Sequence, residues 1–247
     1  MLKKAALMIV CLLSLVAGSA MAEEKVLING IDANYPPFAF VDQSGKPSGF
    51  DVEALDWVAA KMGFKVKHVP VDWDGIIPSL LAKKIDMICS GMTITAERAE
   101  KVNFSNVYWE VKNVFVTKKG SALKADEIYK KDVKIGMQAG TSEAKWMEEE
   151  KTKQGWKFTI RYYDSAPMAI EDVVNGRIDA AAMNLPPAED AAKKKPVQII
   201  GTFGEVETFG VAIRKEDKDL LEKINKGFAL LKADPYWQKL IDKHLAK

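Results

Sequence analysis

Two short stretches of the sequence decide the fold: GMTITAER at residues 91–98 and QAGTSE at residues 138–143. Each follows an apolar run of strand character, turns on small and hydroxyl-bearing residues, and then opens a helical pattern. A helix that begins there presents free backbone N–H groups and the positive end of its dipole, which together favour an anion. Arg98 adds a planar guanidinium that can hold a carboxylate with two hydrogen bonds. Two such corners in one chain predict two lobes that close on one small carboxylate.

The first 22 residues have the pattern of a secretory signal peptide. Lys3 and Lys4 precede an apolar run from Ala5 to Ala17, and small residues then lead to Ala22. The run is too short to span a bilayer comfortably, so a membrane anchor is the less favoured alternative. We therefore predict cleavage after Ala22 and export of the mature chain.

Composition limits the classes of partner and cofactor. The chain has 36 Lys and Arg against 34 Asp and Glu, and its formal charge of +2 falls to about zero without residues 1–22, which hold two Lys and no acid. A neutral chain has no bulk field to attract nucleic acid, so we exclude that class. Cys89 is the only cysteine left after cleavage, and we expect it to pack in the core. His68 and His244 are isolated and no cluster has metal-ligand spacing, so we expect no metal and no other cofactor.

Strand-like and helix-like segments alternate along the rest of the chain. This pattern predicts an α/β protein with mostly parallel sheets flanked by helices. Residues 51–62 have helical spacing with Gly63 as the stop, and 75–84 read as a short helix with Pro78 in its first turn.

Strand-like segments at 113–117 and 210–214 are interpreted as two crossings between lobes. The first lobe is then residues 23–112 plus 210–247, and the second is 113–209. A two-strand hinge would let the lobes close with little repacking.

The order of the short motifs along the chain resembles a known family. The motifs are DANYPPF (32–38), GFD (49–51), DWDGIIPSL (72–80), KID (84–86), the two stretches quoted above, FS (104–105), GRIDA (176–180) and GVAIRK (210–215). The chain resembles the periplasmic polar amino acid-binding proteins, which are type II solute receptors of ABC importers. The resemblance covers essentially the whole mature chain, and the ordered set carries it rather than any one motif.

The resemblance implies a two-lobed, periplasmic-binding-protein-like clamshell with a two-strand hinge and no catalysis of its own. It implies a monomer that binds a small-molecule ligand, an amino acid or a related carboxylate, and passes it to an ABC permease in the inner membrane. The candidate ligand-binding residues lie in or beside the motifs: Asp32, Tyr35, Trp73, Gly91, Met92, Thr93, Arg98, Gln138, Thr141, Ser142 and Asn184.

The resemblance also implies separate roles for these residues. Arg98, the backbone at Thr93 and the helix start at Thr141 and Ser142 would hold the ligand carboxylate, and the Gly91 carbonyl would accept from its ammonium. The remaining positions match the walls around the ligand side chain: two aromatic residues, Tyr35 and Trp73, and the carboxylate of Asp32. The alternative for Arg98 is a surface ion pair with Glu97 or Glu100, and for the hydroxyl residues it is plain helix capping, which uses the same geometry.

The sequence departs from the family at one place that matters. Family members usually have an Asp that pairs with the ligand ammonium where this chain has Asn184. Losing a buried charge-assisted hydrogen bond costs very roughly 1–3 kcal/mol. Either another acid, Asp32 or Glu143, replaces the missing carboxylate, or the ligand head group is not that of a standard α-amino acid.

Two other functions remain open from the sequence. Some chains that look like this family are cyclohexadienyl dehydratases, in which a general acid occupies the place of Asn184, and an amide there is a poor proton donor. A ligand-sensing partner of a membrane receptor is the other alternative, and it would be an added role.

Overall fold

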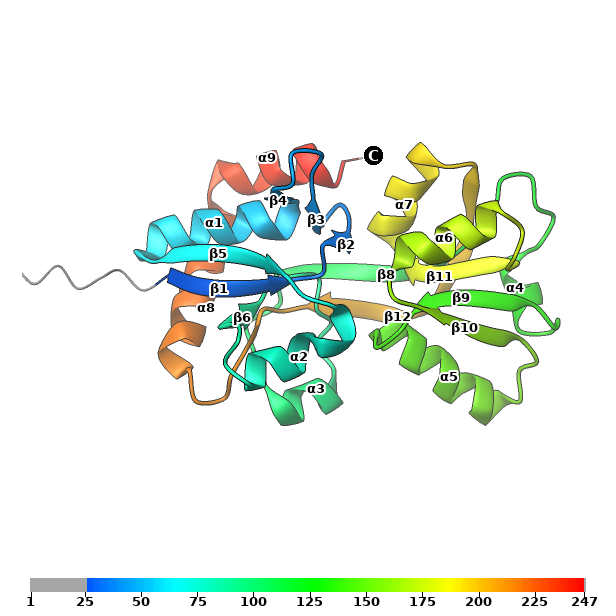
Figure 1. Ribbon diagram of the computed structural model, residues 1–247, viewed down its shortest axis with the longest axis horizontal. Coiled ribbons are helices and arrows are strands. Elements are labelled where there is room, and N and C mark those ends of the chain that lie inside the picture. Colours follow the sequence, from blue (N-terminus) through cyan, green and yellow to red (C-terminus); the bar gives the residue numbers. More distant parts are fainter. Residues whose placement is uncertain (1–25, 247) are drawn as a thin grey trace, which may run out of the picture.

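The computed structural model describes residues 26–246, so the predicted signal peptide, residues 1–22, lies outside the described residues. Two α/β lobes lie side by side, each built on one five-stranded sheet, and long strands run between them (Figure 1). The predicted two-lobed α/β clamshell is confirmed. Each sheet combines parallel with antiparallel pairings, so the sheets are mixed. Within residues 26–246, no helix has both the length and the apolar character to cross a membrane.

The first lobe has strand order β5-β1-β6-β13-β7, with β5, β1 and β6 parallel and β13 antiparallel to its neighbours. Its strands are β1 (Val26–Ile31), β5 (Lys65–Pro70), β6 (Met87–Ile88), β7 (Asn103–Phe104) and β13 (Ala212–Ile213). Its helices are α1 (Phe50–Met62), α2 (Trp73–Leu81), α3 (Ala96–Lys101), α8 (Lys218–Ala233) and α9 (Pro235–His244). A small separate sheet is formed by β2 (Asn34–Tyr35), β3 (Ala39–Val41) and β4 (Pro47–Ser48).

The second lobe has strand order β10-β9-β11-β8-β12, with β10, β9 and β11 parallel and the two long strands antiparallel. Its strands are β8 (Trp109–Lys118), β9 (Lys134–Gln138), β10 (Thr159–Tyr163), β11 (Ala180–Asn184) and β12 (Val197–Phe209). Its helices are α4 (Ala125–Ile128), α5 (Ser142–Gln154), α6 (Ala166–Val174) and α7 (Leu185–Lys194).

The chain crosses between the lobes in β8 and β12. Val111 and Phe209 pack in the core of the first lobe, whereas Val114 and Phe203 pack in the cores of the second. The prediction that 210–214 is the second crossing is wrong. Within that segment β13 is fully buried in the first sheet, because it pairs with β6 on one side and β7 on the other.

The local structure follows the sequence at one helix and departs from it at another. Helix α1 ends at Gly63, whose φ of 70° is left-handed and suits a residue without Cβ. Helix α2 begins at Trp73, two residues before the predicted start, so Pro78 lies inside the helix rather than in its first turn. Trp73 is therefore the first residue of a helix and not part of a loop.

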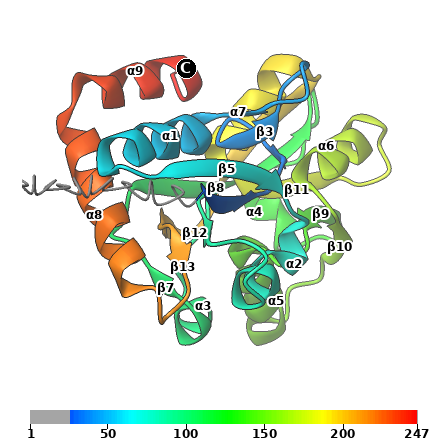
Figure 2. The ribbon, with the colours of Figure 1, turned by 60° about the vertical axis from the view of Figure 1, so that its left-hand side comes forward.

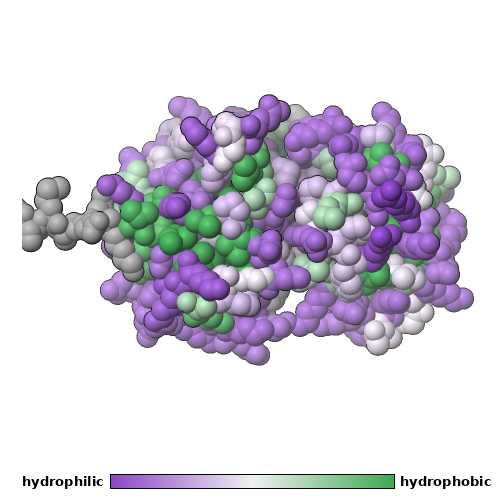
Figure 3. All heavy atoms as spheres, viewed as in Figure 1, coloured by the Kyte–Doolittle hydropathy of each residue, from purple (hydrophilic) through white to green (hydrophobic). Residues whose placement is uncertain are grey.

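Helices α8 and α9 both pack on α1 at the outer side of the first lobe, as a second view shows (Figure 2). Their contact is apolar, since Val58, Ile224, Phe228 and Leu240 share one buried cluster. On the face shown in Figure 3, most of the hydrophobic residues lie on the first lobe, and the second lobe is mainly hydrophilic. Each lobe thus has its own core, and the surfaces between them are left for polar contacts.

Candidate functional site

A small cavity lies between the two lobes, and both contribute to its walls. The lining residues are Asp32, Tyr35, Trp73, Ser90, Gly91, Thr93 and Arg98 from the first lobe, and Gln138, Thr141, Ser142, Glu143 and Asn184 from the second. Every residue proposed from the sequence lines it except Met92. The Met92 side chain is fully buried in the core of the first lobe, beside Ile76 and Leu80. Ser90 is added to the set by the structure, and Glu143, named from the sequence as a possible substitute acid, also lines the cavity.

Arg98 joins the two lobes at one end of the cavity. It lies in α3, whose N-cap Thr95 accepts a hydrogen bond from the Arg98 backbone N–H through Oγ1 at 3.2 Å. The guanidinium donates from Nη1 to the Thr93 carbonyl at 2.9 Å and from Nη2 to the Gly140 carbonyl of the other lobe at 3.0 Å. Its carbon lies 5.5 Å from the ring centroid of Trp73, within cation–π range. Burial lowers the pKa of Arg98, which leaves a cation at neutral pH.

The second corner is the start of α5. Thr141 is its N-cap, and its Oγ1 accepts from the Ala144 N–H at 3.3 Å and donates to the Gln138 carbonyl at 2.9 Å. Gly140 turns the chain there with a φ of 71°, and a Cβ at this position would collide with Asp74. The Gly140 carbonyl is accordingly free to meet the first lobe. The predicted helix start at 141–142 is confirmed.

A chain of neutral side chains crosses the cavity. The Tyr35 hydroxyl donates to Oδ1 of Asn184, and Nδ2 of Asn184 donates to Oδ1 of Asn113 at 2.6 Å. The Tyr35 ring stacks on Phe38 with centroids 5.5 Å apart, which fixes its position. Burial, followed by the negative charge of Glu143, raises the pKa of Tyr35 well above its usual value, so its hydroxyl remains a donor. Asn184 is thereby held by protein groups on both ends of its amide.

Trp73 forms a second contact between the lobes. Its indole Nε1–H donates to the Gly140 carbonyl at 3.2 Å. The same carbonyl accepts from Arg98, so a single oxygen of the second lobe receives two donors of the first. Trp73 therefore lies at the edge of the cavity, where the two lobes meet.

Asp32 lies in the cavity wall of the first lobe and is hydrogen-bonded to the side-chain amide of Gln138 from the second lobe. Its Oδ2 accepts from Gln138 Nε2 at 2.7 Å across the lobes, and its Oδ1 accepts from the Asn34 N–H at 2.9 Å. Ser90 Oγ accepts from the Asp32 N–H at 2.9 Å. Burial raises the pKa of Asp32, and the bond from Gln138 opposes this shift. Both carboxylate oxygens are thus already engaged by neutral donors.

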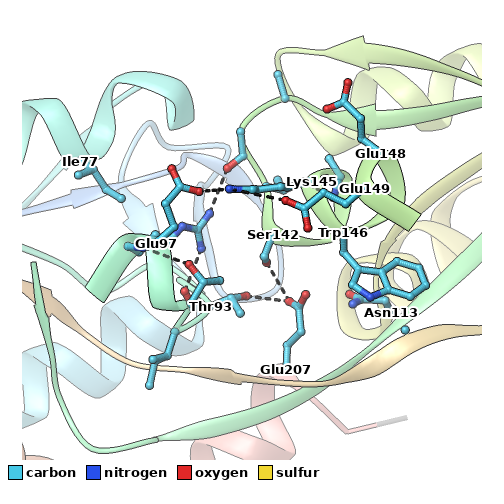
Figure 4. A pocket seen from close by; sticks show the side chains of 18 of the residues that line it. Ile77, Thr93, Glu97, Asn113, Ser142, Lys145, Trp146, Glu148, Glu149 and Glu207 are labelled. Atoms are coloured by element: carbon cyan, nitrogen blue, oxygen red, sulfur yellow. Dashed lines mark hydrogen bonds and ion pairs between the residues drawn. The ribbon is translucent and has the colours of Figure 1, made fainter. Parts of the chain in front are cut away.

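Glu207 is a site residue that the sequence did not reveal. Its Oε2 accepts from Thr93 Oγ1 at 2.8 Å and from Ser142 Oγ at 3.0 Å, so one carboxylate oxygen is bonded to both lobes (Figure 4). Glu207 follows a bulge of β12, because Phe203 pairs with Asn113 whereas Glu207 pairs with Val111. Such an irregular register cannot be read from a sequence pattern, and this is why Glu207 was missed.

Glu143 is a buried carboxylate beside the hydroxyl of Ser142. The residue is 6 % exposed, and the Ser142 Oγ lies 3.4 Å from its Oε2. Burial in the first place, and then the charge of Glu207, raise the pKa of Glu143 to about 7, whereas Arg98 opposes the shift. A buried acid with this pKa lies near half protonation at neutral pH.

A wider groove adjoins the cavity on the side of α3 and α5, and it is lined by Glu97, Lys145 and Glu207 among others. Lys145 of α5 forms an ion pair with Glu97 of α3 across the lobes, and both side chains are about half exposed (Figure 4). An exposed pair of this kind contributes little to stability. Within residues 26–246, no group of three or more His, Cys, Asp or Glu side chains could hold a metal ion.

Comparisons with known proteins agree on one family. The model for bacterial extracellular solute-binding proteins, family 3, matches residues 27–247. The L-arginine-binding protein of Pseudomonas aeruginosa is 33 % identical over 256 residues, covering 99 % of this chain and 97 % of that protein. The L-cystine-binding protein TcyJ of Escherichia coli is 34 % identical over 226 residues, covering 90 % and 83 %. Among solved structures, an ancestral amino acid-binding protein described as a precursor of cyclohexadienyl dehydratase has a TM-score of 0.83 and 38 % identity, covering 90 % of this chain and 96 % of that one.

Proposed function

Because the chain belongs to the bacterial extracellular solute-binding proteins of family 3, we propose that it captures an amino acid or a related small carboxylate between its lobes and delivers it to an ABC transporter. The single observation that carries this proposal is the position of Arg98, half-buried at the boundary of the lobes and hydrogen-bonded to both. The names of the arginine-binding and cystine-binding relatives support an amino acid as the ligand.

In the proposed complex, the two helix starts hold the carboxylate. Arg98 turns its guanidinium from the backbone carbonyls to the ligand, and the N–H groups at the start of α5, behind Thr141 and Ser142, complete the anion site. The Gly91 carbonyl is directed to the ligand head group. Tyr35 and Trp73 provide the apolar walls, and the Asp32–Gln138 pair faces the ligand side chain.

Closure of the lobes would be driven by the ligand itself. A ligand that contacts both lobes binds the closed arrangement more tightly than the open one, and it shifts the population by that difference in affinity. The hinge segments of β8 and β12 are the only two crossings in the described part of the chain. We propose the lobes as residues 23–112 plus 210–247 and 113–209. Phe209, however, packs in the core of the first lobe. We therefore propose that the second boundary lies slightly before residue 210 rather than at it.

The proposal includes the location and the partners. Residues 1–22 would direct export and be removed, and the mature monomer would act in the periplasm and dock on an inner-membrane permease. A relative from Salmonella typhimurium, 30 % identical and named a histidine-binding periplasmic protein, supports this location. Neither a cofactor nor a catalytic step is part of the proposal.

A thermal-shift screen tests the proposal. The mature protein is unfolded and refolded to remove any carried ligand, and is then screened with the twenty standard amino acids, ornithine, citrulline, opines, simple carboxylates and prephenate. A compound present at about a thousand times its Kd adds roughly 4 kcal/mol to the free energy of unfolding, a shift of several degrees.

Binding of an amino acid that is lost in Arg98→Ala supports the proposal. A panel in which no carboxylate shifts the midpoint would contradict it. Turnover of prephenate, measured as formation of phenylpyruvate, would instead support a dehydratase. A quench of tryptophan fluorescence on binding, absent in Trp73→Phe, would place the ligand at the cavity.

A further inference from the structure

The geometry points to Glu143 as the acceptor of the ligand ammonium, in place of an acid at Asn184, with a proton leaving Glu143 as the ammonium arrives. This inference rests on the proposed function and concerns the same cavity. It chooses between Asp32 and Glu143, the two acids that line the cavity, and it gives the protein a pH-dependent affinity.

Asn184 is not free to replace the missing acid. Its Oδ1 accepts from the Tyr35 hydroxyl and its Nδ2 donates to Asn113. A neutral amide oxygen that already accepts one hydrogen bond is a weak partner for an ammonium ion. We conclude that Asn184 fixes the position of Tyr35 between the lobes.

Both carboxylate oxygens of Asp32 already accept hydrogen bonds from neutral protein groups. Gln138 and the Asn34 N–H occupy one oxygen each at 2.7 and 2.9 Å. An ammonium at Asp32 would compete with the contact that Gln138 makes across the lobes. Asp32 is therefore better placed to face the ligand side chain than its head group.

Glu143 has the opposite environment. It lines the cavity, is 6 % exposed, and has a hydroxyl contact of 3.4 Å with Ser142. That hydroxyl has one proton, and it also lies 3.0 Å from Glu207, so it cannot donate fully to both carboxylates. Both guanidinium contacts of Arg98 go to backbone carbonyls. The two carboxylates therefore share the Ser142 proton; Glu207 also accepts from Thr93 Oγ1 at 2.8 Å, whereas the further donor to Glu143 is a backbone N–H.

Glu143 lines the same cavity as Tyr35 and Asn184. Among the charged groups that raise the pKa of Tyr35, Glu143 has the largest effect, ahead of Asp51, Glu207 and Asp32. An ammonium bonded to Glu143 would thus lie in the cavity that Asn184 also lines, where the Gly91 carbonyl, contributed by the other lobe, would be its second acceptor.

A ligand ammonium would bring positive charge to the cluster around Glu143, where two carboxylates, Glu143 and Glu207, face one cation, Arg98. The charged and titratable groups facing Glu143 are Glu207 on β12, Arg98 on α3 and the Tyr35 hydroxyl. Without a ligand, a proton on Glu143 relieves the repulsion with Glu207. When an ammonium binds, it offsets the charge of Glu207 in place of that proton, which passes to solvent, so one positive charge enters the cluster as one leaves.

The sign of the pH dependence follows from this exchange. The pKa of free Glu143 is about 7 and an ammonium lowers it, so binding releases a proton below about pH 7. Affinity for an amino acid should rise with pH from about 5 to 7.5, by at most about tenfold per pH unit for a single proton. An acid without the ammonium should release none.

The test is titration calorimetry with the twenty L-amino acids at pH 5.5, 6.5 and 7.5, each pH in two buffers of different ionisation enthalpy. Each amino acid that binds is paired with the acid that lacks its α-ammonium, which is 5-guanidinopentanoate in the case of L-arginine. The variants are Glu143→Gln and, as a matched control on β12, Glu205→Gln, an exposed residue of the outer groove.

In the wild type we expect proton release with the amino acid and none with the paired acid. In Glu143→Gln the affinity for the amino acid should fall about tenfold or more, the release should vanish, and the affinity for the paired acid should be unchanged or higher. Glu205→Gln should behave as the wild type. If Glu143→Gln binds amino acids with wild-type affinity and pH dependence, the inference is overturned and the proposed function stands. If only a carboxylate without an α-ammonium binds the wild type, the inference is overturned and the proposed function stands; if no carboxylate binds, both are overturned.

Discussion

Tyr35 and Asn184 are 149 positions apart in the chain and meet between the lobes, where the Tyr35 hydroxyl donates a hydrogen bond to the Asn184 side-chain oxygen. Both residues are more than nine-tenths buried. The bond therefore exists only when the lobes are closed, and it couples the ligand wall to the closure of the hinge.

Tyr35→Phe should weaken the closed arrangement. The variant keeps the ring on Phe38 but leaves the Asn184 oxygen without its donor, at a cost of about 1 kcal/mol or somewhat more. We expect ligand affinity to fall about fivefold to tenfold, and small-angle scattering should show a larger radius of gyration without ligand. Tyr162→Phe, at an exposed position of the second lobe, is the control. Unchanged affinity and scattering in Tyr35→Phe would contradict this account.

Gly91→Ala should be strongly destabilising. Gly91 has a φ of 59°, and a Cβ there would collide with the Tyr35 ring. Gly63→Ala is a matched control, since Gly63 has a φ of 70° and no atom within 4 Å of an added Cβ. The backbone term, on the order of 1 kcal/mol, is shared, so the difference between the two variants in urea unfolding measures the collision. Equal losses would mean that Tyr35 moves aside freely.

Arg98→Lys should abolish most binding and leave the fold intact. A lysine keeps the charge but not the planar fork that holds a carboxylate with two bonds. We expect affinity to fall about 10- to 100-fold and the midpoint of unfolding without ligand to change little. Arg177→Lys, which alters an ion pair with Asp172 on the outside of the second lobe, serves as the control. Retained affinity in Arg98→Lys would remove Arg98 from the carboxylate site.

Stability without ligand should fall as the pH rises from about 4 to 7. Burial raises the pKa of Asp51 to about 7, although Tyr108 and the Gly91 N–H both bond to it. In this range the unfolded chain has lost the proton that the folded chain keeps, so the free energy of unfolding decreases until the folded group also ionises.

The Asp51 term is on the order of a few kcal/mol at most, and Glu143 adds to it with the same sign. Asp51→Asn should flatten the decline, measured as urea midpoints at pH 5, 6, 7 and 8. A wild-type profile that rises over this interval would show that Asp51 ionises normally.

Much of the fold could be predicted because its signals are local. The two helix starts, the stop of α1 at Gly63 and the alternation of strands with helices depend on neighbours in sequence. The second crossing was misplaced because Ala212 and Ile213 read as a strand, and a sequence does not tell which sheet accepts a strand. Helix α2 begins two residues before its predicted start, so Trp73 opens it.

The site was predictable where a motif fixed the side chain and less so where register or packing decided. Arg98 lies in the first turn of α3, Thr141 is the N-cap of α5 and Asn184 ends β11, and all three line the cavity. Met92 stands between Gly91 and Thr93, which both line the cavity, but its own side chain turns into the core. Glu207 depends on a bulge, and its approach to Thr93 and Ser142 is a long-range contact that no local pattern encodes.

The discontinuity of the first lobe has a consequence for the order in which the molecule folds. Strand β13 lies between β6 and β7, and α8 packs on α1, so the first sheet and its core remain incomplete until the last part of the chain is available. The second lobe is one continuous segment and can fold as soon as β12 has been made. Contacts of long sequence separation form slowly, so we expect the second lobe to form first and to serve as the fixed base on which the two ends of the chain are brought together.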